Sequence, residues 1–128
     1  MPRISRFYWR LAVLYGVAGL TLGTFMGATQ DFTLTTIHVH LGLLGWFPMA
    51  VYALFFGAVP AAAEGRLAWA QFGLANAGLV ALLGGVALIV TGGTQVAEVA
   101  APGSLLSLAS MLCFAVIVLR HTGSAAQR

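Results

Sequence analysis

The sequence predicts an all-α integral membrane protein, a four-helix bundle that forms one domain over residues 1–128. The chain is 60% hydrophobic and only 7% charged, whereas about a quarter of the residues of a soluble domain are charged. Its apolar residues gather into four runs, each close to the ~20 residues that cross a hydrocarbon core of ~30 Å. The runs are continuous, unlike the alternating segments of ~10 residues that build a membrane barrel.

We expect the four helices over residues 8–28, 36–59, 66–91 and 102–120. In the second, Pro48 removes the backbone hydrogen bond to the carbonyl of Leu44, which predicts a local kink. The fourth run is short, and its helix is expected to start near Pro102. Polar side chains on the third and fourth helices are expected to hydrogen-bond across the bundle; they are Gln71, Asn76, Ser107 and Ser110.

Small residues recur along the first and third helices. The two stripes are Gly19, Gly23 and Gly27, and Gly73, Ala77, Ala81 and Gly85. Small side chains let membrane helices approach closely. The stripes therefore predict close packing, either within one bundle or between copies in a homo-oligomer.

The arginines predict the orientation. They precede the first helix, separate the second from the third and follow the fourth, at positions Arg3, Arg6, Arg10, Arg66, Arg120 and Arg128. The other two connections carry Asp31 and Glu98 instead. This positive-inside pattern predicts cytoplasmic termini and a multi-pass protein of a bacterial inner membrane. Six dispersed arginines do not form the basic face that nucleic-acid binding needs.

Two histidines, His38 and His40, begin the second apolar run at its outer end. An ionisable side chain in hydrocarbon is costly, so an intramembrane histidine predicts a site, and neutral imidazole is the commonest protein ligand for metals. Residues two apart on a regular helix point roughly 200° apart. The two histidines therefore cannot easily bind one ion from the same regular helix.

The two histidines head different helix faces. His38 continues through Gly42, Gly45 and Met49, which are small or soft, whereas bulky leucine, phenylalanine and valine follow His40. A planar macrocycle ligated by an imidazole needs a flat surface beside it, which favours His38 as the ligand. In the alternative interpretation, His38 bonds a carbonyl and water between helices, and the glycines serve packing.

Three segments resemble short four-helix proteins related to the large subunit of haem-copper oxidases and nitric oxide reductases (cytochrome c oxidase subunit I-like). They are residues 10–16, residues 25–27 and residues 38–46 with Val59-Pro60. The resemblance implies that His38 corresponds to an axial ligand of the low-spin haem. His40 stands where the large enzymes often carry Asn. The further histidines of their binuclear centre have no counterpart here, which argues against a stand-alone oxidase or reductase.

A low-spin haem takes two axial ligands, commonly His/His or Met/His. Met26 lies at about the depth of His38 and is one candidate for the second ligand. A histidine from a second copy, His38 or His40, is the preferred one and would place the cofactor in a homo-oligomer interface. Met49 is expected to pack against the porphyrin edge, and the propionates to point toward Thr33, Thr35 and Thr36.

These observations favour a b-type haem-binding membrane protein that carries electrons or binds a diatomic gas, with a redox partner that the sequence does not identify. One alternative is a copper site made by His38, His40 and Met26, which requires the start of the second helix to unwind. Another is a cofactor-free structural or assembly subunit. No nucleophile–base constellation or phosphate-binding glycine loop is present in the sequence.

Overall fold

The computed structural model describes residues 1–92 and 97–123, and within these ranges it is helical, with no strand. Its elements are α1 (Arg3–Thr29), α2 (Thr35–His40), the π-helix η1 (Leu41–Trp46), α3 (Phe47–Ala58), the short 3₁₀-helix η2 (Pro60–Ala63), α4 (Arg66–Gly92) and α5 (Ala97–Thr122). The elements α2, η1 and α3 form one continuous helix, Thr35–Ala58, which we call the second span. In the described residues four helices are long and apolar enough to cross a membrane. The predicted all-α, multi-pass architecture is confirmed.

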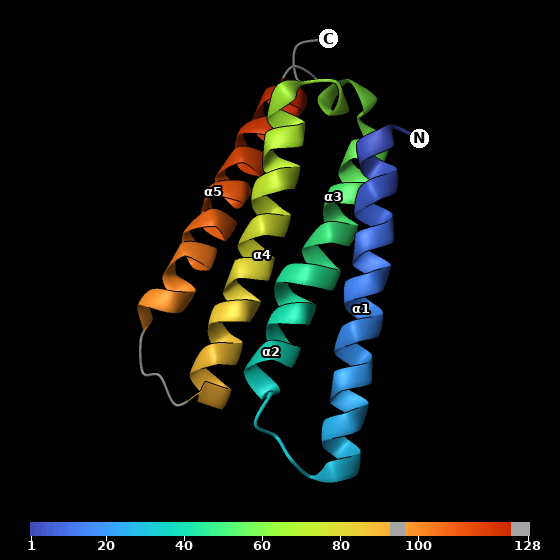
Figure 1. Cartoon of the computed structure of the whole chain (residues 1–128). Coiled ribbons are helices and arrows are strands. Elements are labelled where there is room, and N and C mark those ends of the chain that lie inside the picture. The colour runs from blue at the N-terminus through green and yellow to red at the C-terminus, as the bar shows by residue number, and fades with distance from the viewer. Residues whose placement is uncertain (93–96, 124–128) are drawn as a thin grey trace.

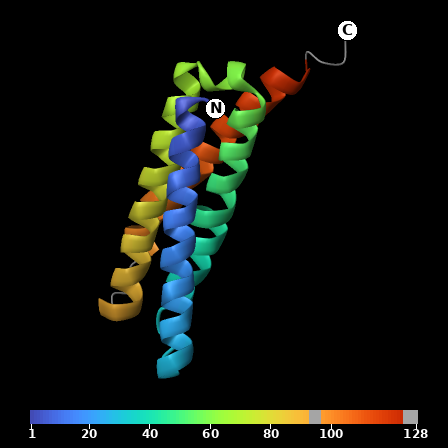
Figure 2. The same cartoon turned by 90° about the vertical axis from the view of Figure 1, so that its right-hand side faces the viewer.

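The helices pair as two antiparallel hairpins, α1 with the second span and α4 with α5 (Figure 1). The start of α1 and the end of α5 lie at the same end of the bundle, which we call the terminal end; the end where α1 meets α2 is called the loop end (Figure 1). A view turned by 90° shows α5 inclined to the other helices (Figure 2). The two hairpins are joined near the terminal end by η2.

Two helices begin earlier than the sequence predicted. α1 starts at Arg3 rather than at residue 8, directly after Pro2. α5 starts at Ala97 rather than at residue 102, so Pro102 lies inside the helix. A proline inside a helix removes one hydrogen bond. Here that loss falls near the beginning of α5, and the helix continues through it.

Buried polar side chains connect α1, α4 and α5. The Tyr8 hydroxyl donates to the side-chain oxygen of Gln71. The Gln71 amide donates to the Ser110 hydroxyl at 3.2 Å, and that hydroxyl lies 3.3 Å from the Gln71 carbonyl, to which it donates. A polar group in hydrocarbon must find its partner within the protein. The cross-helix role predicted for Gln71 and Ser110 is confirmed.

Of the other two polar residues, Asn76 also bonds across the bundle as predicted, whereas Ser107 does not. The Tyr15 hydroxyl of α1 donates to the Asn76 side-chain oxygen at 3.0 Å, so Asn76 bonds α1 rather than α5. Ser107 lies against Gly78, and its buried hydroxyl has no hydrogen-bond partner within the described residues. The expected cross-helix bond of Ser107 is therefore not formed.

The closest contact between α4 and α5 depends on glycines. A Cβ added to Gly78 would lie 2.7 Å from the Ser107 nitrogen, and one added to Gly103 would lie 2.2 Å from the Leu82 nitrogen. A Cβ added to Gly85 would likewise lie 2.6 Å from the Val99 carbonyl oxygen of α5. Of the two glycines in the predicted stripe, Gly85 serves this contact and Gly73 does not, because a Cβ on Gly73 would meet nothing within 4 Å.

The proline in the second span is accommodated by a wider helical turn. The backbone N–H of Phe47 donates to the carbonyl of Gly42, five residues earlier. Pro48 follows immediately and has no N–H of its own to place. A single π-helical stretch, a feature common at functional sites, therefore stands where the sequence predicted a kink.

We expect Gly103→Ala to destabilise the protein by about 1–3 kcal/mol, the usual cost of overpacking, because the new methyl group would collide with the α4 backbone. Gly84→Ala is the matched control, since a Cβ there meets nothing within 4 Å and alanine favours a helix by up to ~1 kcal/mol over glycine. Denaturant unfolding in detergent, followed by circular dichroism, measures both. Equal stabilities of the two variants would contradict the packing described for α4 and α5.

Candidate functional site

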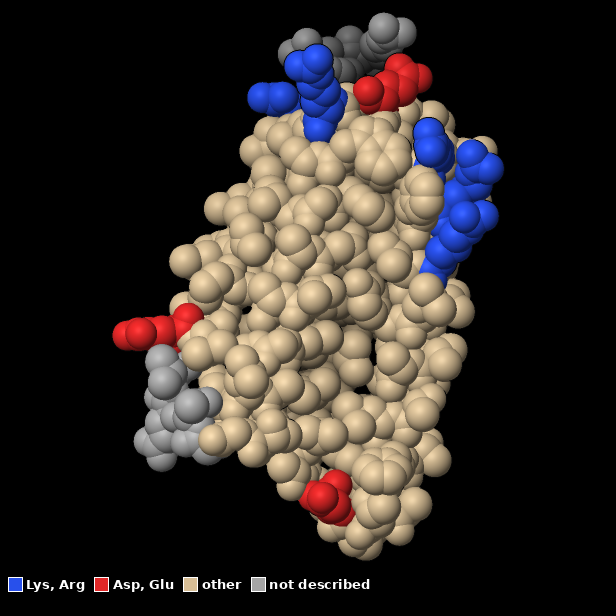
Figure 3. Space-filling view, viewed as in Figure 1, with Lys and Arg blue, Asp and Glu red and all other residues tan. Residues whose placement is uncertain are grey.

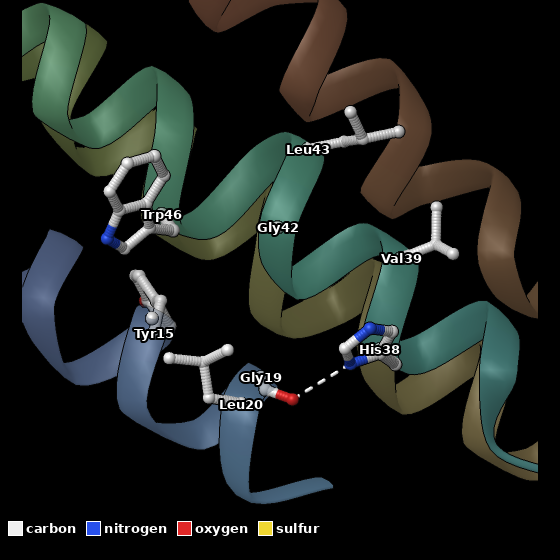
Figure 4. Close-up of a pocket in the computed structure, with 9 residues that line it drawn as sticks. Tyr15, Gly19, Leu20, His38, Val39, Gly42, Leu43 and Trp46 are labelled. Atoms are coloured by element: carbon white, nitrogen blue, oxygen red, sulfur yellow. Dashed lines mark hydrogen bonds between the residues drawn. The ribbon is translucent and has the colours of Figure 1, made fainter. Parts of the chain in front are cut away.

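A cavity of about 590 Å³ lies between α1 and the second span, within the ~300–1,000 Å³ range typical of ligand pockets. Figure 4 shows α1 on one side of it and the second span on the other. Its walls are mostly apolar, with one imidazole. The lining residues are Tyr15, Gly16, Gly19, Leu20, His38, Val39, Gly42, Leu43 and Trp46.

Glycines of α1 allow the second span to lie close enough to form this site. A Cβ on Gly16 would stand 2.1 Å from Trp46 Cδ1, and a Cβ on Gly23 would stand 2.7 Å from His38 Cε1. The predicted stripe on the first helix therefore serves the chain's own helix pair at Gly19 and Gly23. A Cβ on Gly27, its last member, would meet nothing within 4 Å.

The half-buried His38 ring is held by α1. Its Nδ1 lies 2.8 Å from the carbonyl oxygen of Gly19 (Figure 4). Since a carbonyl only accepts, Nδ1 carries the proton, and in the neutral ring the lone pair belongs to Nε2. Figure 4 shows this second nitrogen on the side of the ring turned away from Gly19. Metal-ligating histidines are commonly fixed in this way, by donating the other ring N–H to a carbonyl.

His40 does not line the cavity. Its Nδ1 lies 2.7 Å from the carbonyl of Thr36, one turn earlier on its own helix. α2 is a regular helix through both histidines, so the unwinding that the copper alternative requires is not observed. Within the described residues, no group of three or more His, Cys, Asp or Glu side chains is placed to hold a metal ion.

The remaining predicted residues separate into two groups. Gly42 lines the cavity, and a Cβ there would meet nothing within 4 Å. Gly45 instead packs on α1, where its Cβ would lie 2.8 Å from Tyr15 Cβ. Met49 and Met26 are buried, with 1% and 4% of their surfaces exposed, and neither lines the cavity. The expectation that Gly45 and Met49 share a face with His38 and Gly42 is therefore not met.

The π-helix explains this difference. A wider turn holds more residues than an α-helical turn, so spacing by four keeps His38, Gly42 and Trp46 on the cavity face. Ideal α-helical spacing placed Gly45 and Met49 there instead. For this reason Trp46 was not predicted to face the cavity, although Pro48 indicated an irregular helix. Gly16 and Leu20 were not predicted to line the cavity, because their position there depends on how α1 lies against the second span.

The polar connection at the loop end is largely self-bonded. The Asp31 carboxylate accepts hydrogen bonds from the Thr33 hydroxyl at 2.6 Å and backbone N–H at 3.0 Å, which lower the pKa of this exposed group. The Thr35 hydroxyl donates to the Phe32 carbonyl at 2.6 Å. Two of the three threonines suggested for the propionates thus have local partners.

Comparison with known protein families, with curated proteins and with solved structures found no match to this chain.

We expect Gly23→Ala to displace the His38 ring, because the added methyl group would overlap it. The hydrogen bond to Gly19 should then break, and the fixed tautomer should be lost. Nitrogen NMR of histidine-labelled protein in detergent reports the proton on each ring nitrogen. Gly27→Ala should leave the signals unchanged, since nothing lies near it; an unaltered His38 signal in Gly23→Ala would contradict the geometry described.

Proposed function

We propose that this chain is a multi-pass protein of a bacterial inner membrane, with cytoplasmic termini, that binds haem b through Nε2 of His38. The observation that carries the proposal is the 2.8 Å contact between His38 Nδ1 and the Gly19 carbonyl. That bond orients the ring and leaves the other nitrogen as the coordinating atom. The arginine pattern and the four spans support the location.

The lining of the cavity suits a large, flat, apolar group. Gly42 presents backbone rather than a side chain, and the space beyond it is open, whereas the Trp46 ring lies against Gly16. Leu20, Val39 and Leu43 supply apolar contact and exclude water from an imidazole that would bind iron. The iron would bring redox and gas-binding chemistry, which the protein tunes through its ligand and the surrounding dielectric.

This chain brings one strong iron ligand to the cavity. Within the described residues, its lining includes one histidine and no methionine or cysteine, and the Tyr15 hydroxyl is bonded to Asn76. We propose that a histidine of a second copy supplies the other axial ligand. Exposed apolar side chains around the cavity support such a contact, namely Leu20, Val39, Leu43 and Trp46. Without a ligand from a second copy, the haem iron would keep a free coordination position, which favours binding of a diatomic gas.

A cofactor-free structural role is the second candidate. The same hydrogen bond, together with the contact of the His38 ring on Gly23, fastens α1 to the second span without any ligand. A haem-binding measurement distinguishes the haem-binding function from the structural role. A structural histidine predicts lower stability on substitution and no absorbance in the visible range.

Haem added to the detergent-purified protein should give a Soret band that His38→Ala abolishes, because the coordinating nitrogen is removed. His40→Ala should keep the band if the second copy contributes its His38. A weakened band in His40→Ala, with loss of the low-spin reduced spectrum, is expected if the second copy contributes this residue. A normal band in His38→Ala would overturn the assignment.

Gly42→Leu should weaken haem binding about tenfold or more, since a leucine would fill the open space beside His38 at a cost above ~1.4 kcal/mol. Gly73→Leu introduces the same side chain into open space on α4 and should not change the affinity. Titration of each variant, followed at the Soret band, measures the difference. Equal affinities would show that the glycine surface is not where the ring lies.

A further inference from the structure

Three arginines lie together at the start of α1. Arg3, Arg6 and Arg10 are spaced by three and four residues, which makes them neighbours on one helix face. With Phe7 they enclose a hollow of about 160 Å³ at the surface. Figure 3 shows basic side chains grouped along this side of the terminal end.

Among the residues that the structure describes, these guanidinium groups have no anionic partner. Within residues 1–92 and 97–123, no carboxylate pairs with them, and the recorded side-chain interaction of Arg3 is with the face of Phe7, 5.8 Å from the ring centroid. Three like charges on adjacent turns repel one another. An anion bound among them would relieve that repulsion.

The backbone adds to the positive potential. α1 begins at Arg3 with no side-chain cap and no acidic residue in its first turn. The first N–H groups of a helix lack intrahelical acceptors, and the helix dipole places partial positive charge at this end. Both effects favour an anion close to Arg3 and Arg6.

The position of the hollow along α1 indicates that a lipid headgroup supplies the anion. The 27 residues of α1 extend ~40 Å, the full thickness of a membrane with its headgroups. Arg3 to Arg10 cover the first ~10 Å, which is the headgroup layer at the terminal end. Phe7 lies 6.1 Å from Trp69 and 6.2 Å from Phe72, measured between ring centroids, and so forms an aromatic layer typical of the membrane interface.

We propose that this hollow binds the phosphate of an anionic phospholipid in the leaflet at the terminal end. Arg3, Arg6 and Arg10 donate to the phosphate oxygens through their planar guanidinium forks. Phe7 and Trp69 contact the glycerol and the first acyl carbons. This lipid site lies at the end of α1 opposite to His38 and does not depend on haem binding.

Native mass spectrometry of the full chain, with added phosphatidylglycerol or phosphatidylcholine, tests the proposal. The wild type should retain phosphatidylglycerol in preference. The double variant Arg6→Gln/Arg10→Gln should bind it about tenfold or more weakly, since each arginine at an anionic surface contributes ~1 kcal/mol. The matched control is Arg66→Gln/Arg120→Gln, which removes equal charge outside the hollow and should bind like the wild type.

Three results would overturn the proposal. Equal losses in both double variants would indicate general charge attraction. Displacement of the lipid by inorganic phosphate at comparable concentration would indicate a site for free anions. Equal retention of the two lipids by the wild type would show no anion preference. Circular dichroism of each variant ensures that a loss of binding is not a loss of the helical fold.

Discussion

The hydrogen bond between the His38 ring and the Gly19 carbonyl is the interaction on which the site depends. Hydrocarbon offers no water to an imidazole, so its N–H must be bonded within the protein. A side chain of the second span can reach the α1 backbone only if the helices are close. Gly16 and Gly23 allow that approach, and the hydrogen bond to Gly19 fixes the tautomer of His38.

Buried polar groups toward the terminal end must also find their hydrogen-bond partners within the protein. There, Tyr8, Gln71 and Ser110 bond one another across three helices, and Tyr15 bonds Asn76. Side chains on facing helices bond one another here, and the Ser5 and Ser110 hydroxyls also donate to the backbone carbonyls of Ala53 and Gln71. The side-chain hydrogen bonds that join α1 to α4 therefore lie between Tyr8 and Tyr15, and the cavity begins at Tyr15 and extends from there toward the loop end.

The architecture was predictable because lipid imposes it. A membrane span must satisfy its own backbone, so long apolar runs become helices, and hydropathy alone located all four. The cross-helix bonding of Gln71 and Ser110 followed from the same need for polar partners, although the sequence did not predict which residues pair. The common face of His38 and Gly42 was also predictable, since one regular helical turn lies between them and the π-helix has little effect over that distance.

The other residues that line the cavity could not be predicted from the sequence. Pro48 indicated an irregular helix, but the sequence does not distinguish a kink from a π-helix. The π-helix places Trp46 on the cavity face, whereas regular α-helical spacing would place Gly45 there. The contact of Gly103 with Leu82 likewise depends on how α5 crosses α4. Periodicity describes one helix at a time, whereas these contacts depend on the placement of two.

The cavity is bordered by side chains on the outer surface of the chain, with Leu20 73% and Leu43 63% exposed. In a bilayer such residues face acyl chains or a neighbouring subunit. A small molecule would therefore enter sideways from within the bilayer, and its partition coefficient would set how often the cavity is filled. A sparingly soluble compound that dissolves well in lipid would reach His38 more readily than an abundant hydrophilic one.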